Sequence, residues 1–313
     1  MTTNADASIA PERAVRSHSL FLAIACALAG AGAGCGGTMV DLGDPRPAPY
    51  RFGMPRLLAE LDTTYANQNP TLTGDLLDIF FTSNRGDMAA DVWTAHRALP
   101  TDPFAAPTLV AEVSSPMYET SPAISVDGLS LYVGSDRDGT TGSIDIWSAT
   151  RPDRSAAWSA PENLTALNSP ANDIPRPPGQ HGLVMPMASE RDVTGGYRTY
   201  LAQRPDVSQP FGAPAVITGL VGGDIFADAF LSDDGLTMFY AAARGTAKPD
   251  LFVAWRATTA DRFSLPTPLS DLNTAADERD PWLSPDGTMF YFTSDRENGV
   301  LQIFEATARR QTR

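Results

Sequence analysis

Five polar residues hold equivalent positions in a sequence that repeats itself, and three of them are carboxylates. Acidic side chains gathered around one point could bind a cation, a sugar or a basic side chain. Two of them could also hydrolyse a glycosidic bond, one protonating the leaving oxygen while the other attacks or activates water. The alternative is that they cap strand starts by accepting hydrogen bonds from local backbone amides. The candidate ligand-binding residues are Asn69, Ser121, Asp173, Asp228 and Asp280.

The chain has few residues that could support other catalytic chemistry, such as nucleophilic or metal-dependent catalysis. The sequence holds two cysteines and three histidines, and Cys26, Cys35 and His18 lie in a segment that we expect to be a leader and anchor. The two remaining histidines, His96 and His181, are too few for a histidine-rich zinc site, and a Ser-His-Asp triad has little support. We therefore expect no metal, no cofactor and no catalytic residue, and we favour a non-enzymatic protein while leaving the enzyme alternative open.

The charge of the chain argues against a nucleic-acid partner. Its formal net charge is -14, whereas binding to phosphates needs a basic surface that releases counterions. With 42% hydrophobic and 19% charged residues, the composition is that of an ordinary globular protein that can bury a large core. We expect a monomer.

The five candidates recur because the chain consists of repeats of about 52 residues. Two markers measure this period independently. Each unit opens with an aromatic residue, at Phe52, Phe104, Trp158, Phe211 and Phe263. The central phrase of each unit closes with an arginine, at Arg85, Arg137, Arg191, Arg244 and Arg296. A fixed period of this size indicates a stacked or circular array in which each unit buries its apolar face against its neighbours.

Each repeat contains four short segments that are typical of strands. Apolar residues alternate along them, and prolines in nearly every segment exclude a run of helices. Asp127-Gly128 separates two such segments and predicts a two-residue hairpin turn, because both residues tolerate positive φ. The same pair recurs at Asp234-Gly235 and Asp286-Gly287. Four antiparallel strands per unit predict an all-β, five-bladed β-propeller over residues 51–309, with a tail at 310–313.

Closure of the ring follows from where the repeats begin and end. The first repeat starts with the phrase of a fourth strand, from Phe52 to Leu61, whereas the last repeat stops after its third-strand phrase near Ala306. We expect the N-terminal strand to complete the last blade and remove the open sheet edge. The innermost strands of such a ring line its axis, so the five candidate residues should surround the mouth of the central channel.

The repeated arginines are interpreted as architecture rather than as a site. An arginine at a strand end can bond neighbouring carbonyls, or pair with the aspartate that opens the third-strand phrase, and so hold blade to blade. A unique site is expected where the repeats diverge most, in the insertions 175–179 and 192–196 of the third repeat.

The N-terminal segment predicts export. Arg13 and Arg16 precede an apolar run from Leu20 to Gly34 that is too short and too glycine-rich to span a bilayer stably, which is typical of a signal peptide at 1–34. The sequence Gly32-Ala-Gly-Cys35 resembles the lipobox of bacterial lipoproteins, which implies lipidation of Cys35. Residues 35–50 would form a flexible tether. The expected location is the outer membrane, through the lipid anchor alone, or the periplasm.

The last repeat carries a family resemblance. Asp280-Pro-Trp-Leu-Ser-Pro-Asp-Gly287, followed by Met289-Phe-Tyr-Phe-Thr-Ser-Asp-Arg296, resembles the WD40-like Pro-Asp repeat of TolB-type β-propellers. The resemblance extends from Phe52 to Arg309. It implies a cell-envelope propeller that acts as a binding or scaffolding module for a protein or glycan partner. The alternative is a five-bladed glycoside hydrolase or lyase that uses the channel-mouth carboxylates.

Overall fold

The computed structural model describes residues 48–86, 89–192, 196–217, 228–243 and 248–311. The expected signal peptide, Cys35 and most of the expected tether lie outside these residues, as do Arg244, part of the insertion at 192–196 and the last two residues of the tail. In the described part of the chain, no helix is long and apolar enough to cross a membrane.

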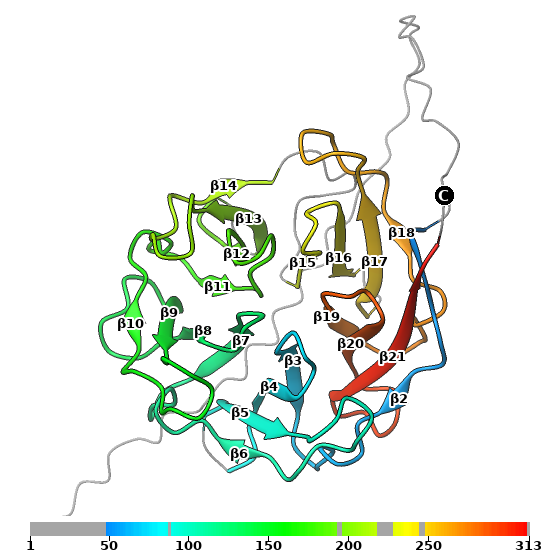
Figure 1. Cartoon of the computed structure of the whole chain (residues 1–313), viewed down its shortest axis with the longest axis horizontal. Helices are drawn as coiled ribbons and strands as arrows, with labels where there is room; N and C mark the ends of the chain where they lie inside the picture. The colour runs from blue at the N-terminus through cyan, green and yellow to red at the C-terminus, as the bar shows by residue number, and fades with distance from the viewer. Residues whose placement is uncertain (1–47, 87–88, 193–195, 218–227, 244–247, 312–313) are drawn as a thin grey trace, which may run out of the picture.

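Five antiparallel sheets surround a central axis, so the prediction of a five-bladed propeller is confirmed (Figure 1). The innermost strands are β3 (Asn67–Leu72), β7 (Glu119–Ile124), β11 (Asp173–Pro175), β15 (Phe230–Leu231) and β19 (Glu278–Leu283). The second strands are β4 (Asp78–Ser83), β8 (Ser130–Ser135), β12 (Val184–Ser189), β16 (Thr237–Ala242) and β20 (Met289–Ser294). The third strands are β5 (Asp91–His96), β9 (Asp145–Thr150), β13 (Arg198–Gln203), β17 (Asp250–Trp255) and β21 (Gln302–Arg310). The outermost strands of blades 1 to 4 are β6 (Thr108–Leu109), β10 (Glu162–Asn163), β14 (Ala215–Val216) and β18 (Thr267–Pro268).

The N-terminal segment closes blade 5. This agrees with the prediction from a first repeat that starts with its fourth strand and a last repeat that stops after its third. Strands β1 (Tyr50–Phe52) and β2 (Arg56–Leu57) both pair with β21, in the registers Phe52 to Ala308 and Leu57 to Phe304. The backbone amide of Leu58 continues the ladder by donating to the carbonyl of Ile303 at 3.0 Å. The outer edge of the last sheet is therefore covered by the first strands of the chain.

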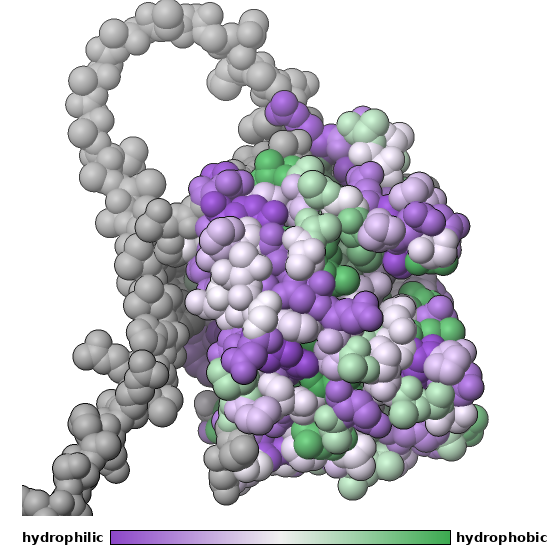
Figure 2. All heavy atoms as spheres, turned by 90° about the vertical axis from the view of Figure 1, so that its left-hand side faces the viewer, coloured by the Kyte–Doolittle hydropathy of each residue, from purple (hydrophilic) through white to green (hydrophobic). Residues whose placement is uncertain are grey.

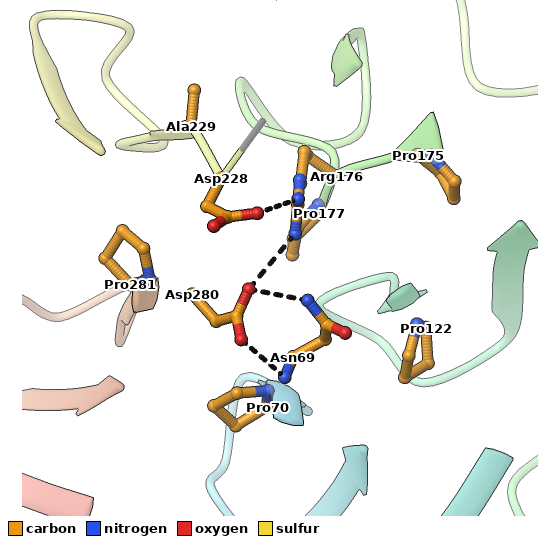
Figure 3. Close-up of a pocket in the computed structure, with 10 residues that line it drawn as sticks. All are labelled: Asn69, Pro70, Pro122, Pro175, Arg176, Pro177, Asp228, Ala229, Asp280 and Pro281. Carbon is orange, nitrogen blue, oxygen red and sulfur yellow. Dashed lines mark hydrogen bonds and ion pairs between the residues drawn. The ribbon is translucent and has the colours of Figure 1, made fainter. Parts of the chain in front are cut away.

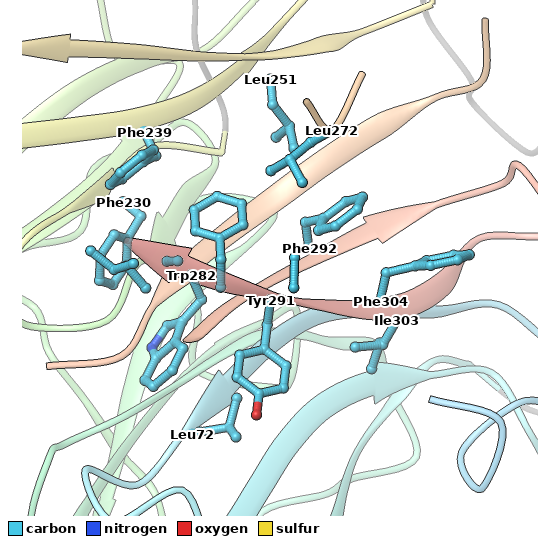
Figure 4. Close-up of a cluster of buried hydrophobic side chains, with 14 of the residues drawn as sticks. Leu72, Phe230, Phe239, Leu251, Leu272, Trp282, Tyr291, Phe292, Ile303 and Phe304 are labelled. Atoms are coloured by element: carbon cyan, nitrogen blue, oxygen red, sulfur yellow. The ribbon is translucent and has the colours of Figure 1, made fainter. Parts of the chain in front are cut away.

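The core lies between neighbouring blades rather than within one sheet. The largest buried cluster joins blades 4, 5 and 1, and includes Phe239, Tyr291 and Phe292 (Figure 4). Smaller clusters join blades 3 and 4, 2 and 3, and 1 and 2. Each large apolar side chain that is fully buried contributes about 1.5–3 kcal/mol. The ring therefore depends on every blade having both neighbours.

The hairpin turns differ in detail from the two-residue turns that the sequence predicts. Gly128 has a φ of 75°, and its amide donates to the carbonyl of Ser125 at 2.8 Å. Asp127 is not among the residues with positive φ; its carboxylate accepts bonds from the Ser125 hydroxyl at 2.6 Å and the Leu129 amide at 3.0 Å. The loop is thus a four-residue turn that glycine closes in the left-handed region, a conformation that costs other residues about 1–2 kcal/mol.

The repeated arginine bonds a carbonyl of the preceding blade, as predicted. Arg137 donates from Nε to the Ser135 hydroxyl at 2.9 Å and from Nη2 to the carbonyl of Val113. Its acidic partner is Glu119 on the innermost strand, at 3.0 Å, rather than the third-strand aspartate that was the alternative to carbonyl bonding. The guanidinium also lies over the ring of Trp147, 5.3 Å from its centre. Equivalent serine and carbonyl bonds are made by Arg85, Arg191 and Arg296.

A second arginine recurs in four blades and was missed in the sequence. Arg151 stacks on Trp158 at 4.3 Å and donates from Nε to the carbonyl of Gly128 at 2.8 Å. It therefore joins the aromatic residue that opens the next repeat to the hairpin turn of its own blade. Similar pairs are Arg97 with Phe104, Arg204 with Phe211 and Arg256 with Phe263.

The outer wall of the ring is mixed in character. Over the side formed by blades 2 and 3, hydrophilic and hydrophobic residues are interspersed (Figure 2). Single exposed apolar side chains of this kind are ordinary on a folded protein.

Candidate functional site

Three candidates share an unusual backbone conformation on the innermost strands. Asn69, Ser121 and Asp280 have φ angles of 54°, 51° and 53°, and a proline follows each of them. Each lies where the register between the innermost and second strands shifts. A residue in the left-handed region at a bulge re-aims its side chain away from the regular pleat. The recurrence in three blades makes this bulge part of the blade design.

The side chains of Asn69 and Asp280 meet at the axis (Figure 3). Asp280 accepts hydrogen bonds from the Asn69 amide at 3.1 Å and from the Asn69 Nδ2 at 2.6 Å. These bonds join blade 5 to blade 1. The capping alternative is thus partly realised, although the amide that Asp280 caps belongs to the neighbouring blade.

Arg176 lies between Asp228 and Asp280. Its Nη2 donates to Asp228, and its Nη1 lies 3.8 Å from Asp280 Oδ1. The arginine side chain is 8% exposed and that of Asp280 is 2% exposed. One buried guanidinium therefore neutralises charge on carboxylates from two blades.

Burial governs the ionisation of Asp280. It raises the pKa of this carboxyl to about 7, repulsion from Asp228 adds to the rise, and Arg176 and Arg279 lower the pKa. Arg279 is itself held by Asp277, with 2.8 Å between its Nε and Oδ1. In the axial group, the Arg176 guanidinium thus contacts both Asp228 and Asp280.

Asp173 does not belong to this group, contrary to the alignment of the third repeat. It is fully buried, accepts bonds from the Ser169 hydroxyl at 2.7 Å and from Arg191 at 2.6 Å, and pairs with Ser189 in the sheet register. It therefore matches Glu119, which binds Arg137 in the same way. The position equivalent to Asn69 is Pro175, two residues later.

Arg176 was missed because the third repeat departs from the pattern there. Blades 1, 2 and 5 carry a proline after the bulge residue, at Pro70, Pro122 and Pro281, and blade 3 carries Arg176 instead. The signal was present, since this arginine lies inside the insertion 175–179 where we expected a unique site.

Ser121 faces a different environment from Asn69. Its amide donates to the Thr82 hydroxyl of blade 1 at 3.0 Å, and its own hydroxyl lies 3.4 Å from that of Thr120. Blade 2 contributes Pro122, rather than Ser121, to the lining of the axial cavity. Three of the five predicted residues are therefore brought together, namely Asn69, Asp228 and Asp280.

The axial cavity between these side chains is small. Its volume is about 10 Å³, and its walls include Asn69, Arg176, Asp228 and Asp280. This is room for about one water molecule. A cavity of about 310 Å³ lies toward the hairpin-turn end of the same inner strands, and Pro177 lines both cavities.

The donor set does not suit a metal ion. Among the described residues there is no group of three or more histidine, cysteine, aspartate or glutamate side chains that could hold one. The two axial carboxylates already share Arg176.

Neither a family model nor a curated protein sequence matches this chain. Solved structures do resemble it. TolB from Acinetobacter baumannii is 16% identical with a TM-score of 0.50, over 80% of this chain and 56% of TolB. The chain thus spans little more than half the length of that protein.

Glycoside hydrolases resemble the chain to the same degree. The catalytic domain of the Coprinopsis cinerea GH62 α-L-arabinofuranosidase is 11% identical with a TM-score of 0.55, over 83% of this chain and 96% of that domain. Zg3597, a family 117 glycoside hydrolase of Zobellia galactanivorans, is 12% identical with a TM-score of 0.52, over 83% and 90%. At these identities the likeness shows a shared propeller fold and does not choose between binding and catalysis.

Proposed function

We propose that this chain is a non-enzymatic binding propeller of the cell envelope, which recruits a protein or glycan partner through one end of its central channel. The observation that carries the proposal is the ion pairing of Arg176 with Asp228 and Asp280. A glycosidase needs two carboxyl groups placed on either side of a sugar. Here both acids are tied to one buried guanidinium, around a cavity with room for about one water molecule.

The second candidate is a glycoside hydrolase, and one observation favours it. Asp280 has a pKa raised to about 7, chiefly by burial, which is the property of a general acid that works near neutral pH. A catalytic role requires Arg176 to leave so that a sugar could reach the carboxyl. The resemblance to GH62 and family 117 enzymes adds fold-level analogy alone.

The test combines partner capture with an activity assay. The full-length protein is immobilised and exposed to a detergent extract of its own envelope. We expect a partner to be retained by the wild type and by Met54→Arg, a change on a residue that is 93% exposed at the outer edge of blade 5. Val126→Arg, at the lining of the wide cavity, should lose that partner.

The same preparations are assayed with aryl α-L-arabinofuranosides and other aryl glycosides. We expect no turnover that Asp228→Asn or Asp280→Asn abolishes. Turnover that depends on these two acids would replace the binding proposal by the hydrolase. Equal capture by Val126→Arg and the wild type would place any partner away from the channel.

We also propose that the protein is exported and anchored through lipidated Cys35, at the outer membrane or in the periplasm. Support comes from the charged and apolar pattern of residues 1–34 and the small residues before Cys35. Cys35→Ala should be exported but recovered in the soluble fraction, and should not incorporate labelled fatty acid. Membrane recovery equal to that of the wild type would contradict the anchor.

A further inference from the structure

The wide cavity of the channel has the size of a small-molecule site. Its volume of about 310 Å³ lies at the lower end of the range for ligand pockets, about 300–1,000 Å³. It lies where the innermost strands of blades 1, 2, 4 and 5 run into their hairpin turns, and the insertion of blade 3 supplies Pro177, Pro178 and Gly179 to its wall. Pro177 also lines the small axial cavity of about 10 Å³, whose walls include Arg176.

Aromatic rings form part of the wall. Phe230 and Trp282 lie side by side, with ring centres 6.2 Å apart (Figure 4). Tyr50, from the strand that closes the ring, lines the same cavity. Leu72, Ile124 and Leu283 complete the apolar surface. Such rings attract a cation placed over their faces.

The rim of the cavity carries an excess of negative charge. Among the described residues that line it, three carboxylates, Asp233, Asp234 and Asp286, accompany one guanidinium, that of Arg310, and the imidazole of His181. Arg310 lies 3.2 Å from Asp234 Oδ2. That ion pair leaves Asp233 and Asp286 without an arginine or lysine partner in this lining. Asp233 lies beside the His181 imidazole, with 3.1 Å between Oδ2 and Nδ1.

Amide and hydroxyl donors also hold these carboxylates in place. Asp233 accepts the His181 amide at 2.7 Å, and Asp286 accepts the hydroxyls of Ser284 at 2.6 Å and Thr288 at 2.8 Å. Neutral donors fix the orientation of a carboxylate without cancelling its charge. The rim is therefore prepared for a positive group without the cost of ordering side chains on binding.

We propose that the wide cavity binds a small organic cation, an ammonium group attached to an apolar body. The aromatic and aliphatic wall would hold the apolar body, and Asp233 and Asp286 would face the ammonium. An anion of the same size would meet two carboxylates, and a neutral compound would leave them without a new partner. The modest volume of the cavity favours a small molecule over a peptide. The inference rests on the proposed function in that it takes the channel as a binding site.

The experiment compares three probes of similar size and different charge. Benzylammonium, benzyl alcohol and benzoate are titrated into the full-length protein by isothermal calorimetry at low and at physiological salt. We expect benzylammonium to bind at least about tenfold more tightly than the other two probes, a difference of about 1.4 kcal/mol. Raising the salt concentration should weaken its binding more than that of benzyl alcohol.

Two variants locate the site, and a third controls for net charge. Asp233→Asn keeps an oxygen that can accept the His181 amide and removes the charge, and Trp282→Leu removes one ring. Both should raise the Kd of benzylammonium several-fold, with melting checked by circular dichroism. Glu162→Gln removes the same charge from the exposed outer strand β10, and it should leave the Kd unchanged.

Four results would overturn the inference. They are equal binding of the three probes, tighter binding of benzoate, an equal loss of affinity in Glu162→Gln, and binding of an Ala-Arg-Ala peptide amide where benzylammonium does not bind. Each of these leaves the proposed function standing. Turnover of aryl glycosides that requires Asp228 or Asp280 would instead contradict the proposed function. It would not change the results of these titrations.

Discussion

At the scale of single residues, most of the repeated polar side chains hold blades together. The arginine of each central phrase was expected to be structural, and the carbonyl bonds of the four described arginines agree with this. Its acidic partner could not be read from the sequence, because it is set by the pairing register that places Glu119 beside Ser135. The second arginine series, such as Arg151 on Trp158, could have been found, since it recurs with the same period as the aromatic residues.

Removal of Arg137 should therefore be costly. Arg137→Met leaves the Glu119 carboxylate, whose side chain is 0% exposed, without its cation in the core. We expect the free energy of unfolding to fall by about 3–5 kcal/mol, as measured by urea denaturation at pH 7. Arg262→Met, on an exposed loop residue, should change it by less than about 0.5 kcal/mol. A similar small change in both variants would contradict the structural role.

Asp280 should make stability depend on pH. Its pKa in the folded state, about 7, exceeds the ordinary value of 3.8, so the folded protein holds a proton that the unfolded chain releases. The contribution of this group to the free energy of unfolding is therefore greatest below pH 4 and is lost as the pH rises toward 7.

Asp280→Asn cannot ionise, and it isolates this effect. Urea denaturation from pH 4 to pH 8 should give curves that converge or cross, because the wild type loses stability relative to the variant up to pH 7. Above that pH the difference should be constant. Parallel curves for the two proteins would mean that the folded-state pKa is not raised.

The candidate site was only partly predictable from the sequence. Asn69 and Asp280 precede prolines in repeats that match well, so their common position could be found. Asp173 was misplaced by two residues, because an aspartate was aligned with an aspartate while the real equivalent is Pro175. Arg176 stands where other blades have a proline. The repeat pattern gives no information about where the side chain of such a divergent residue points.

Among the strands, the pairing of β1 and β2 with β21 closes blade 5. Strands β1 and β2 cover β21, and Leu58 and Leu61 are each 1% exposed in the core that joins blades 4, 5 and 1. Without this segment, blade 5 has an open edge and an unfilled face.

Deletion of residues 51–62 should therefore abolish soluble folded protein. Soluble yield and the thermal melting curve are the measurements. Met54→Arg, within the same segment but 93% exposed, should melt cooperatively at nearly the wild-type temperature. A deletion variant that melts as cooperatively as the wild type would contradict closure by this segment.

For the whole molecule, the repeat period of the sequence predicted most of the fold. Blade number follows from counting the arginines, and strand number follows from the turns, even though the Asp-Gly turns are longer than predicted. The shape of the channel could not be foreseen. It depends on which side chains close it, and the ion pairs of Arg176 set that shape through contacts between blades 3, 4 and 5.

A double-mutant cycle measures whether the axial acids are structural partners of Arg176. Urea denaturation of the wild type, Arg176→Met, Asp228→Asn and the double variant gives the coupling energy. We expect both single variants to be less stable than the wild type, with a coupling of about 0.5–3 kcal/mol. An Asp228→Asn variant that is more stable than the wild type would contradict a structural role for the axial acids, because gained stability is typical of removing an acid that is kept for activity.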